Sequence, residues 1–294
     1  MPRSPDPRRL LPDGSYVTPS TGAYDDAHFE VTLRDVAVHP IGYRRDDTQP
    51  LPSNFNEIKA FLGGRRDDSA TSESDVVGRP LHLLLGTESL NQKSKKNHAF
   101  NSAALFDPFL IDPKPDVYYG SNASDIHSQV RADLGDLIRP SKKATNSWAP
   151  NFFIEAKGPD GTLKVLDRQI MYDGAFGARA MFALQNYCRT GEDLIFDRKA
   201  YTMSVSINGA GDVAIFATHV EPSFIPGQKE EYFTTKVKTY DATSDMEDFK
   251  KALHAFRRAR KFAAEQREIL IAHANAMANA LNTPTRAGAQ YVDN

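Results

Sequence analysis

Short apolar runs and one long periodic stretch fill the middle of the chain. Residues 116–119 and 151–157 are rich in aromatic and β-branched residues, and each run ends at a glycine, so both are predicted to be strands. Between residues 165 and 187, apolar or small side chains recur every three or four positions, which predicts a helix. Gly174 and Gly177 lie on this stripe and cost helix propensity, which predicts that the helix packs closely on a sheet.

The last third of the chain is predicted to hold a hairpin, a further strand and a long helix. Residues 200–207 and 213–219 flank a glycine-rich turn, and residues 231–240 form another run of strand character. Residues 244–281 contain no glycine or proline, and Ser244 begins a capping box as the expected N-cap. At about 1.5 Å per residue this helix would be roughly 55 Å long. The order of elements predicts an α/β (α+β) fold that ends in a long helix.

The first third of the chain is less regular. Residues 1–25 are rich in proline, serine, aspartate and arginine, so we expect a flexible N-terminal arm, followed by a single domain over 26–294. Residues 26–60 hold short apolar pieces among polar residues. A helix is predicted to begin near residue 69, and residues 92–97, with three lysines, are predicted to form a solvated loop.

Charge and cysteine content exclude several classes of protein. The 36 lysines and arginines against 38 aspartates and glutamates give a formal charge of −2, which excludes a polybasic nucleic-acid binder. A polyanionic partner would need a local basic patch or a metal ion. The single cysteine, Cys188, excludes an intrachain disulfide and any zinc site with two thiolates, and we expect it to be a small buried residue.

No targeting segment is recognisable. No apolar run approaches the ~18 residues of a membrane-spanning helix, and the first residues lack the apolar region of a secretory signal. We therefore expect an intracellular protein, in the nucleus or cytoplasm, that has no membrane partner.

Asp116, Glu155 and Lys157 are the residues that carry candidate chemistry. Alternate residues of a strand share a face, so Glu155 and Lys157 point the same way, about 6.6 Å apart along the strand. If Asp116 lies on the neighbouring strand, two carboxylates converge beside a lysine, and such oxygens suit Mg²⁺. The lysine could then orient a water or stabilise charge on a phosphate. A structural ion pair on a half-exposed sheet is the alternative interpretation.

The sequence around these residues resembles a known superfamily. Pro115-Asp116 followed by Glu155-Ala156-Lys157 resembles the PD-(D/E)XK nucleases. The longer stretches PNFFIEAKGPDG and RQIMYDGAFGARAMFALQNY resemble, more narrowly, the nuclease-like domain widespread in fungal proteins. The resemblance covers roughly residues 70 to 280, and it implies a restriction-endonuclease-like core with a central mixed sheet flanked by helices.

The resemblance also implies roles for individual residues. Asp116 and Glu155 would bind Mg²⁺ (or Mn²⁺) with help from the backbone carbonyl of Ala156, and Lys157 would position the attacking water. Further catalytic residues implied by the resemblance are Gln169 and Tyr172 on the following helix and Glu73 on the first core helix, with Glu57 as the substitute for Glu73. The Gln/Tyr pair is three residues apart here, whereas RecB-like nucleases usually space it by four. The alternative to a catalytic role is ordinary helix packing for the Gln/Tyr pair, and a solvated position on a helix surface for Glu73.

Basic residues gather on the predicted C-terminal helix and in one insertion. Residues 249–264 contain no acid, and their candidate nucleic-acid-binding residues are Lys250, Arg257, Arg258 and Lys261. An ordinary solvated helix face is the alternative. The long insertion 120–150 carries basic residues and Trp148, and is a second candidate substrate-facing element.

The leading hypothesis is a Mg²⁺-dependent nuclease whose partner is nucleic acid, with DNA as the expected substrate. A second hypothesis is an inactive pseudo-nuclease that binds nucleic acid or protein with the same fold. A third is an effector or selfish-element toxin whose target lies in another organism or genome.

Overall fold

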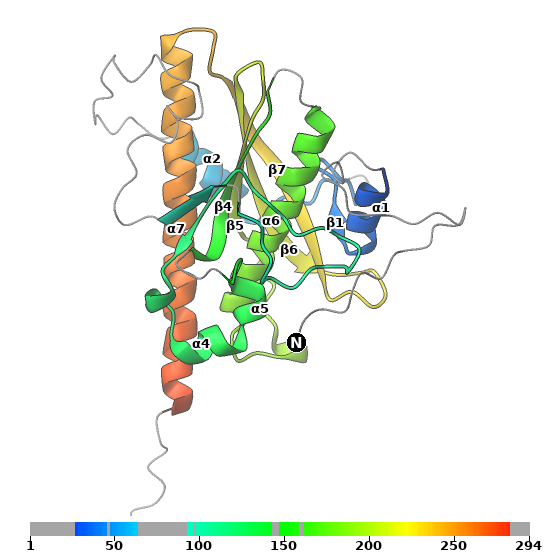
Figure 1. Ribbon diagram of the computed structural model, residues 1–294, viewed down its shortest axis with the longest axis vertical. Helices are drawn as coiled ribbons and strands as arrows, with labels where there is room; N and C mark the ends of the chain where they lie inside the picture. The colour runs from blue at the N-terminus through cyan, green and yellow to red at the C-terminus, as the bar shows by residue number, and fades with distance from the viewer. Residues whose placement is uncertain are drawn as a thin grey trace, which may run out of the picture.

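Seven strands form one mixed sheet in the order β1-β7-β6-β5-β4-β3-β2 (Figure 1), which confirms the predicted mixed α/β architecture. The computed structural model describes residues 27–45, 48–63, 93–96, 98–142, 147–158 and 162–282. The strands are β1 (Val38–His39), β2 (Lys93–Lys96), β3 (Val117–Ser121), β4 (Trp148–Ala156), β5 (Ala200–Ile207), β6 (Asp212–Pro222) and β7 (Glu230–Asp241).

The order of strands follows from how each is connected to the next. β3 and β4 pair antiparallel, whereas β4 and β5 pair parallel. A parallel pair needs a crossover, and the helix α6 (Leu163–Gln185) provides it. β6 and β7 then extend the sheet as antiparallel neighbours, and β1 adds in parallel to β7.

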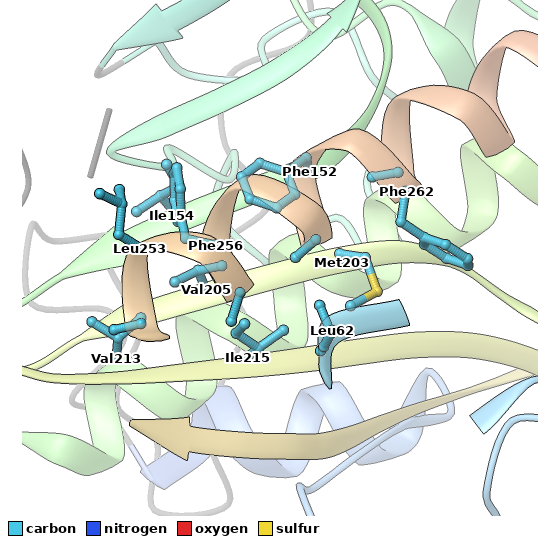
Figure 2. Packing of buried hydrophobic residues seen from close by; sticks show 14 of the residues in the cluster. Leu62, Phe152, Ile154, Met203, Val205, Val213, Ile215, Leu253, Phe256 and Phe262 are labelled. Carbon is cyan, nitrogen blue, oxygen red and sulfur yellow. The ribbon is translucent and has the colours of Figure 1, made fainter. Parts of the chain in front are cut away.

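Helices cover both faces of the sheet. The long helix α7 (Met246–Asn282) and α2 (Phe55–Gly63) pack on one face, and α6 and α1 (Ala27–Asp35) pack on the other. Figure 2 shows the α7 face, where Phe152 and Ile154 of β4 lie beside Leu253 and Phe256 of α7. Because side chains alternate along β4, Phe153 and Glu155 face α6 instead.

The close approach predicted for α6 is confirmed. A Cβ atom added at Gly177 would lie 2.6 Å from Cε2 of Phe153 and 2.7 Å from Cγ2 of Thr202. One added at Gly174 would lie 2.5 Å from Oγ1 of Thr218. The two glycines therefore let the helix axis come nearer to the sheet than any side chain would allow.

The insertion between β3 and β4 packs at the far end of those strands. It contains α4 (Ser128–Asp133) and α5 (Gly135–Ile138), which form a cluster with Trp148, the end of α6 and the second half of α7. Figure 1 shows α4 beside the lower half of α7, whereas α5 lies toward α6. Asp116 precedes β3 and Glu155 is near the end of β4, so this insertion lies at the opposite end of both strands.

Some local predictions differ from the structure. Residues 93–96 form the strand β2, which was predicted to be part of a loop. Asp245, not Ser244, caps α7, because its Oδ1 accepts a hydrogen bond from the Asp248 amide at 2.7 Å. Cys188 is exposed rather than buried.

Two predicted segments, residues 1–25 and the helix from residue 69, lie outside the described residues. Within the described ranges, no helix is both long enough and apolar enough to cross a membrane.

Candidate active site

The register of β3 and β4 brings Asp116 beside Glu155. Val117 pairs with Ile154, so the preceding and following residues, Asp116 and Glu155, lie opposite each other on the face that α6 covers. The amide N–H of Ala156 donates to Oδ2 of Asp116 at 2.8 Å. This bond fixes one carboxylate oxygen of Asp116 against the end of β4.

A third carboxyl group, that of Asp173 on α6, completes the cluster. Glu155 is 0% and Asp173 1% exposed, and their carboxyl groups lie within hydrogen-bonding reach of each other. Two ionised carboxylates cannot hydrogen-bond to each other, and no other described group donates to their four oxygen atoms. Two buried acids without a donor are costly unless they share a proton or bind a cation.

The surroundings of these acids raise their pKa values. Burial, followed by the negative charges of Asp173 and Asp116, raises the pKa of Glu155 well above its usual range. Burial is also the main cause that raises the pKa of Asp173, from 3.8 to about 7. The nearby Lys157 opposes both shifts because its positive charge favours the ionised carboxylates.

Lys157 and Asp116 connect the buried acids to solvent. Both residues are half-buried, whereas Glu155 and Asp173 are inaccessible. The amide of Lys157 donates to the carbonyl of Ile207 at 2.9 Å, which continues the β4–β5 pairing past the end of β4. The backbone therefore holds Lys157 at the end of β4, directly after the residues that carry the acids.

Of the two α6 residues expected in the site, only Gln169 lies on the same side as the acids. Gln169 is buried one helical turn before Asp173, and its Oε1 has no hydrogen-bond donor among the described residues. The hydroxyl of Tyr172 instead donates to the carbonyl of Ile111 at 2.8 Å, and its ring packs against Phe29. The structure therefore brings Gln169, but not the hydroxyl of Tyr172, toward the acids.

The other predicted site residues lie elsewhere. Glu73 is outside the described residues. Its substitute Glu57 lies on α2, and its charge acts on Tyr201 near the start of β5. Glu155 pairs with Ser206 near the end of β5, so Glu57 lies far from the acids.

The basic residues of α7 lie across the sheet from the acids, because α7 and α6 cover opposite faces. Arg258 donates to the carbonyl of Leu62 at 3.3 Å, and Lys261 lies 3.8 Å from Glu265. The structure does not bring these two residues, or Lys250 and Arg257 on the same helix, together with Glu155.

Asp173 is the site residue that sequence reasoning missed. The signal was an acid within the apolar stripe of a predicted helix, four residues after Gln169. That spacing places both side chains on one helix face, but only the packing of α6 on β4 shows that this face meets Glu155.

The donor set fits a hard divalent cation. Carboxylate and carbonyl oxygens are the preferred ligands of Mg²⁺, and the buried oxygens of Glu155 and Asp173 have no competing donor in the described structure. No group of three or more histidine, cysteine, aspartate or glutamate side chains in the described ranges is already arranged to hold a metal. A cation held by these carboxylates would need further oxygen ligands such as waters.

Fold and site together define a mixed α/β protein with a buried carboxylate cluster beside a lysine. Residues 70–274 match the family described as a domain of unknown function (DUF7924), and the chain belongs to that family. No curated protein matches the chain, and no solved structure matches it.

Proposed function

We propose that this protein is a divalent-metal-dependent nuclease that hydrolyses phosphodiester bonds of nucleic acid, with DNA as the expected substrate. The observation that carries the proposal is the pair of buried carboxylates, Glu155 and Asp173, without hydrogen-bond donors and beside Asp116 and Lys157. Burying two acids beside a third is destabilising, and cation binding is a function that accounts for it.

The connectivity around the site supports the resemblance to PD-(D/E)XK nucleases. Asp116 precedes one strand, the Glu155-Ala156-Lys157 run ends its antiparallel neighbour, and α6 then crosses to a parallel strand. The acids and the lysine thus lie at one end of β3 and β4, and α4 and α5 pack at the other end of these strands.

Each residue has a defined part in the proposed reaction. Asp116, Glu155 and the carbonyl of Ala156 would hold Mg²⁺ or Mn²⁺, with Asp173 as a further carboxylate. The bound cation would offset charge on the phosphate and make water more acidic. The Ala156 amide fixes one oxygen of Asp116, and the ammonium group of Lys157 can donate to the attacking water or to a phosphate oxygen.

Cleavage of plasmid DNA, single-stranded DNA and RNA by the purified chain, with Mg²⁺, Mn²⁺ or EDTA, tests this proposal. We expect Glu155→Gln and Lys157→Met each to lower the cleavage rate at least ~100-fold, a size typical of lost transition-state contacts. The matched controls Glu192→Gln and Lys199→Met change exposed residues away from the site and should cut like the wild type. Undiminished cleavage by both site variants would refute the proposal.

The pseudo-nuclease remains the second candidate, because the described acids are not preassembled as a three-carboxylate metal set and Asp116 already accepts the Ala156 amide. Calorimetric titration with Mg²⁺ separates the two functions. Metal binding that is lost in Asp116→Asn and Glu155→Gln supports the enzyme. Absence of metal binding, together with salt-sensitive DNA binding, supports the binding module.

A further inference from the structure

The edge strand β2 ends beside the candidate active site. In the described sheet β2 has one neighbour, β3, and Lys96 pairs with Val117, the residue directly after Asp116. Lys95 pairs with Tyr118 in the same register. Adjacent strands lie about 4.8 Å apart, so both lysines start within the reach of a long side chain from Asp116.

The pleat of the sheet places the two lysines on opposite faces. Tyr118 packs with Phe153 on the α6 face, and cross-strand partners share a face, so Lys95 lies on the same face as Glu155. Lys96 lies on the other face and is exposed, whereas Lys95 is half-buried. Positive charge is therefore available on both sides of the sheet edge next to the acids.

The lysines of β2 supply positive charge that a polyanion needs in order to approach the acids. The site holds three acids, Asp116, Glu155 and Asp173, against the single lysine Lys157, so phosphates need further cations nearby. None of the ion pairs between described residues involves Lys95 or Lys96.

We propose that β2 binds the sugar–phosphate backbone of the DNA strand that enters the active site, through Lys95 and Lys96. The choice of DNA rests on the function proposed above. Lysines on an edge strand also prevent unwanted pairing with other strands. If that were their only role, removing their charge would weaken DNA binding no more than removing the same charge elsewhere on the surface. The two roles therefore differ in a measurable way.

Binding of fluorescently labelled duplex and single-stranded DNA, measured by anisotropy in EDTA between 50 and 200 mM KCl, provides the test. The double variant Lys95→Gln/Lys96→Gln removes two charges while keeping long polar side chains at the edge. The control Lys199→Gln/Lys229→Gln removes the same charge from exposed residues at the other end of the sheet. Lys199 lies seven residues before Ser206, the partner of Glu155, which is about 23 Å along the strand.

We expect the β2 variant to bind DNA about 10-fold or more weakly at 50 mM KCl, with a salt dependence lowered by about one to two ion equivalents. The control should keep wild-type affinity and slope, and both variants should remain monodisperse on size exclusion. Equal affinity of the β2 variant and the control would overturn the inference.

A parallel cleavage assay on the wild type separates this inference from the proposed function. Cleavage by the wild type, with unchanged DNA affinity in the β2 variant, overturns the role of β2 alone. DNA binding that depends on Lys95 and Lys96 without any cleavage supports the role of β2 and counts against the nuclease. No binding and no cleavage would overturn both.

Discussion

Asp173 lies on the face of α6 that meets β4, and the charged groups that act on its pKa are Glu155, Asp116 and Lys157. In the metal-free protein its ionisation is opposed by burial and by the negative charge of Asp116. The acids to which the proposed function assigns cation binding are therefore expected to weaken the fold when no cation is bound. This trade between stability and function is common at catalytic centres.

The pH dependence of stability should reveal this cost. The pKa of Asp173 is about 7 in the folded chain against 3.8 ordinarily, so between about pH 4 and 7 the folded state binds more protons than the unfolded state. The free energy of unfolding should therefore fall as pH rises through this window and level off above it. Asp173→Asn removes the titration and should be more stable than the wild type by about 1–3 kcal/mol at pH 8, and by almost nothing near pH 4.

Urea denaturation in EDTA at several pH values measures this difference. Asp193→Asn, which changes an exposed aspartate, is the matched control and should follow the wild type throughout. Parallel pH profiles for Asp173→Asn and the wild type would contradict the expected cost of the buried carboxyl.

The sequence predicts part of this residue-scale arrangement. The period of a strand is enough to place Glu155 and Lys157 on one face. The position of Asp116 depends on which residue pairs with which across β3 and β4, and no local pattern fixes that register. The inclusion of Asp173 depends on the rotation of α6 about its axis, which the packing of Gly174 and Gly177 on the sheet determines.

At the scale of elements, the fit of α6 against β4 is the contact that sets the site. Gly177→Ala adds a methyl group that would meet Phe153 and Thr202, both fully buried. We expect a loss of about 1–3 kcal/mol in the free energy of unfolding, larger than the ~1 kcal/mol that alanine gains in helix propensity. Gly135→Ala is the control, because nothing lies within 4 Å of its added Cβ, and it should be neutral or slightly stabilising. Equal effects of both substitutions in chemical denaturation would refute the close packing of α6.

The start of α7 offers a second test at this scale. Asp245 accepts the Asp248 amide with its side chain and the Phe249 amide with its carbonyl, so Asp245→Ala should cost about 1 kcal/mol. The hydroxyl of Ser244 instead donates to Asp241, and Ser244→Ala should cost less than Asp245→Ala. Thermal denaturation of the two variants compares the caps directly, and the reverse order would mean that Ser244 caps the helix.

The elements that sequence reasoning found and missed differ in a physical way. The long helix, the hairpin and the strand through Phe153 bury apolar residues at a regular period, and the period reveals them. The strand β2 reads Lys-Ser-Lys-Lys and has no apolar residue, so its pairing with β3 rests on backbone hydrogen bonds that composition does not show. Edge strands are often polar, which makes them hard to distinguish from loops.

At the scale of the whole molecule, a buried network joins the N-terminal elements to the last strands. Nε2 of His39 and Nη2 of Arg45 each lie 2.7 Å from Oε2 of Glu231, and Nη1 of Arg45 lies 3.0 Å from Glu221. Glu221 also lies 3.3 Å from His219. His39 and Arg45 precede the matched family segment, residues 70–274, whereas both glutamates lie within it. The network therefore attaches β1 and the following loop to the family domain.

Burial alone would raise the pKa of Glu231, but hydrogen bonds from the Phe224 amide, His39 and Arg45 outweigh it and lower the pKa. The carboxylate is thus held ionised at neutral pH. Glu231 is nearly inaccessible, whereas Arg45 is half-buried. Glu231→Gln removes one of the two carboxylate partners of Arg45 and should cost about 2–4 kcal/mol.

The loss of stability should first appear as local opening of β1, because β1 contributes only two residues to the sheet. In Glu231→Gln, hydrogen exchange is expected to accelerate in peptides that cover β1 and the loop to Arg45, while peptides from the second half of α7 keep their wild-type protection. The control Glu265→Gln removes an exposed partner of Lys261 at 3.8 Å and should cost less than about 0.5 kcal/mol without changing exchange at β1. A uniform acceleration over the whole chain in Glu231→Gln would show instead that this network supports the entire fold and not the attachment of its N-terminal elements.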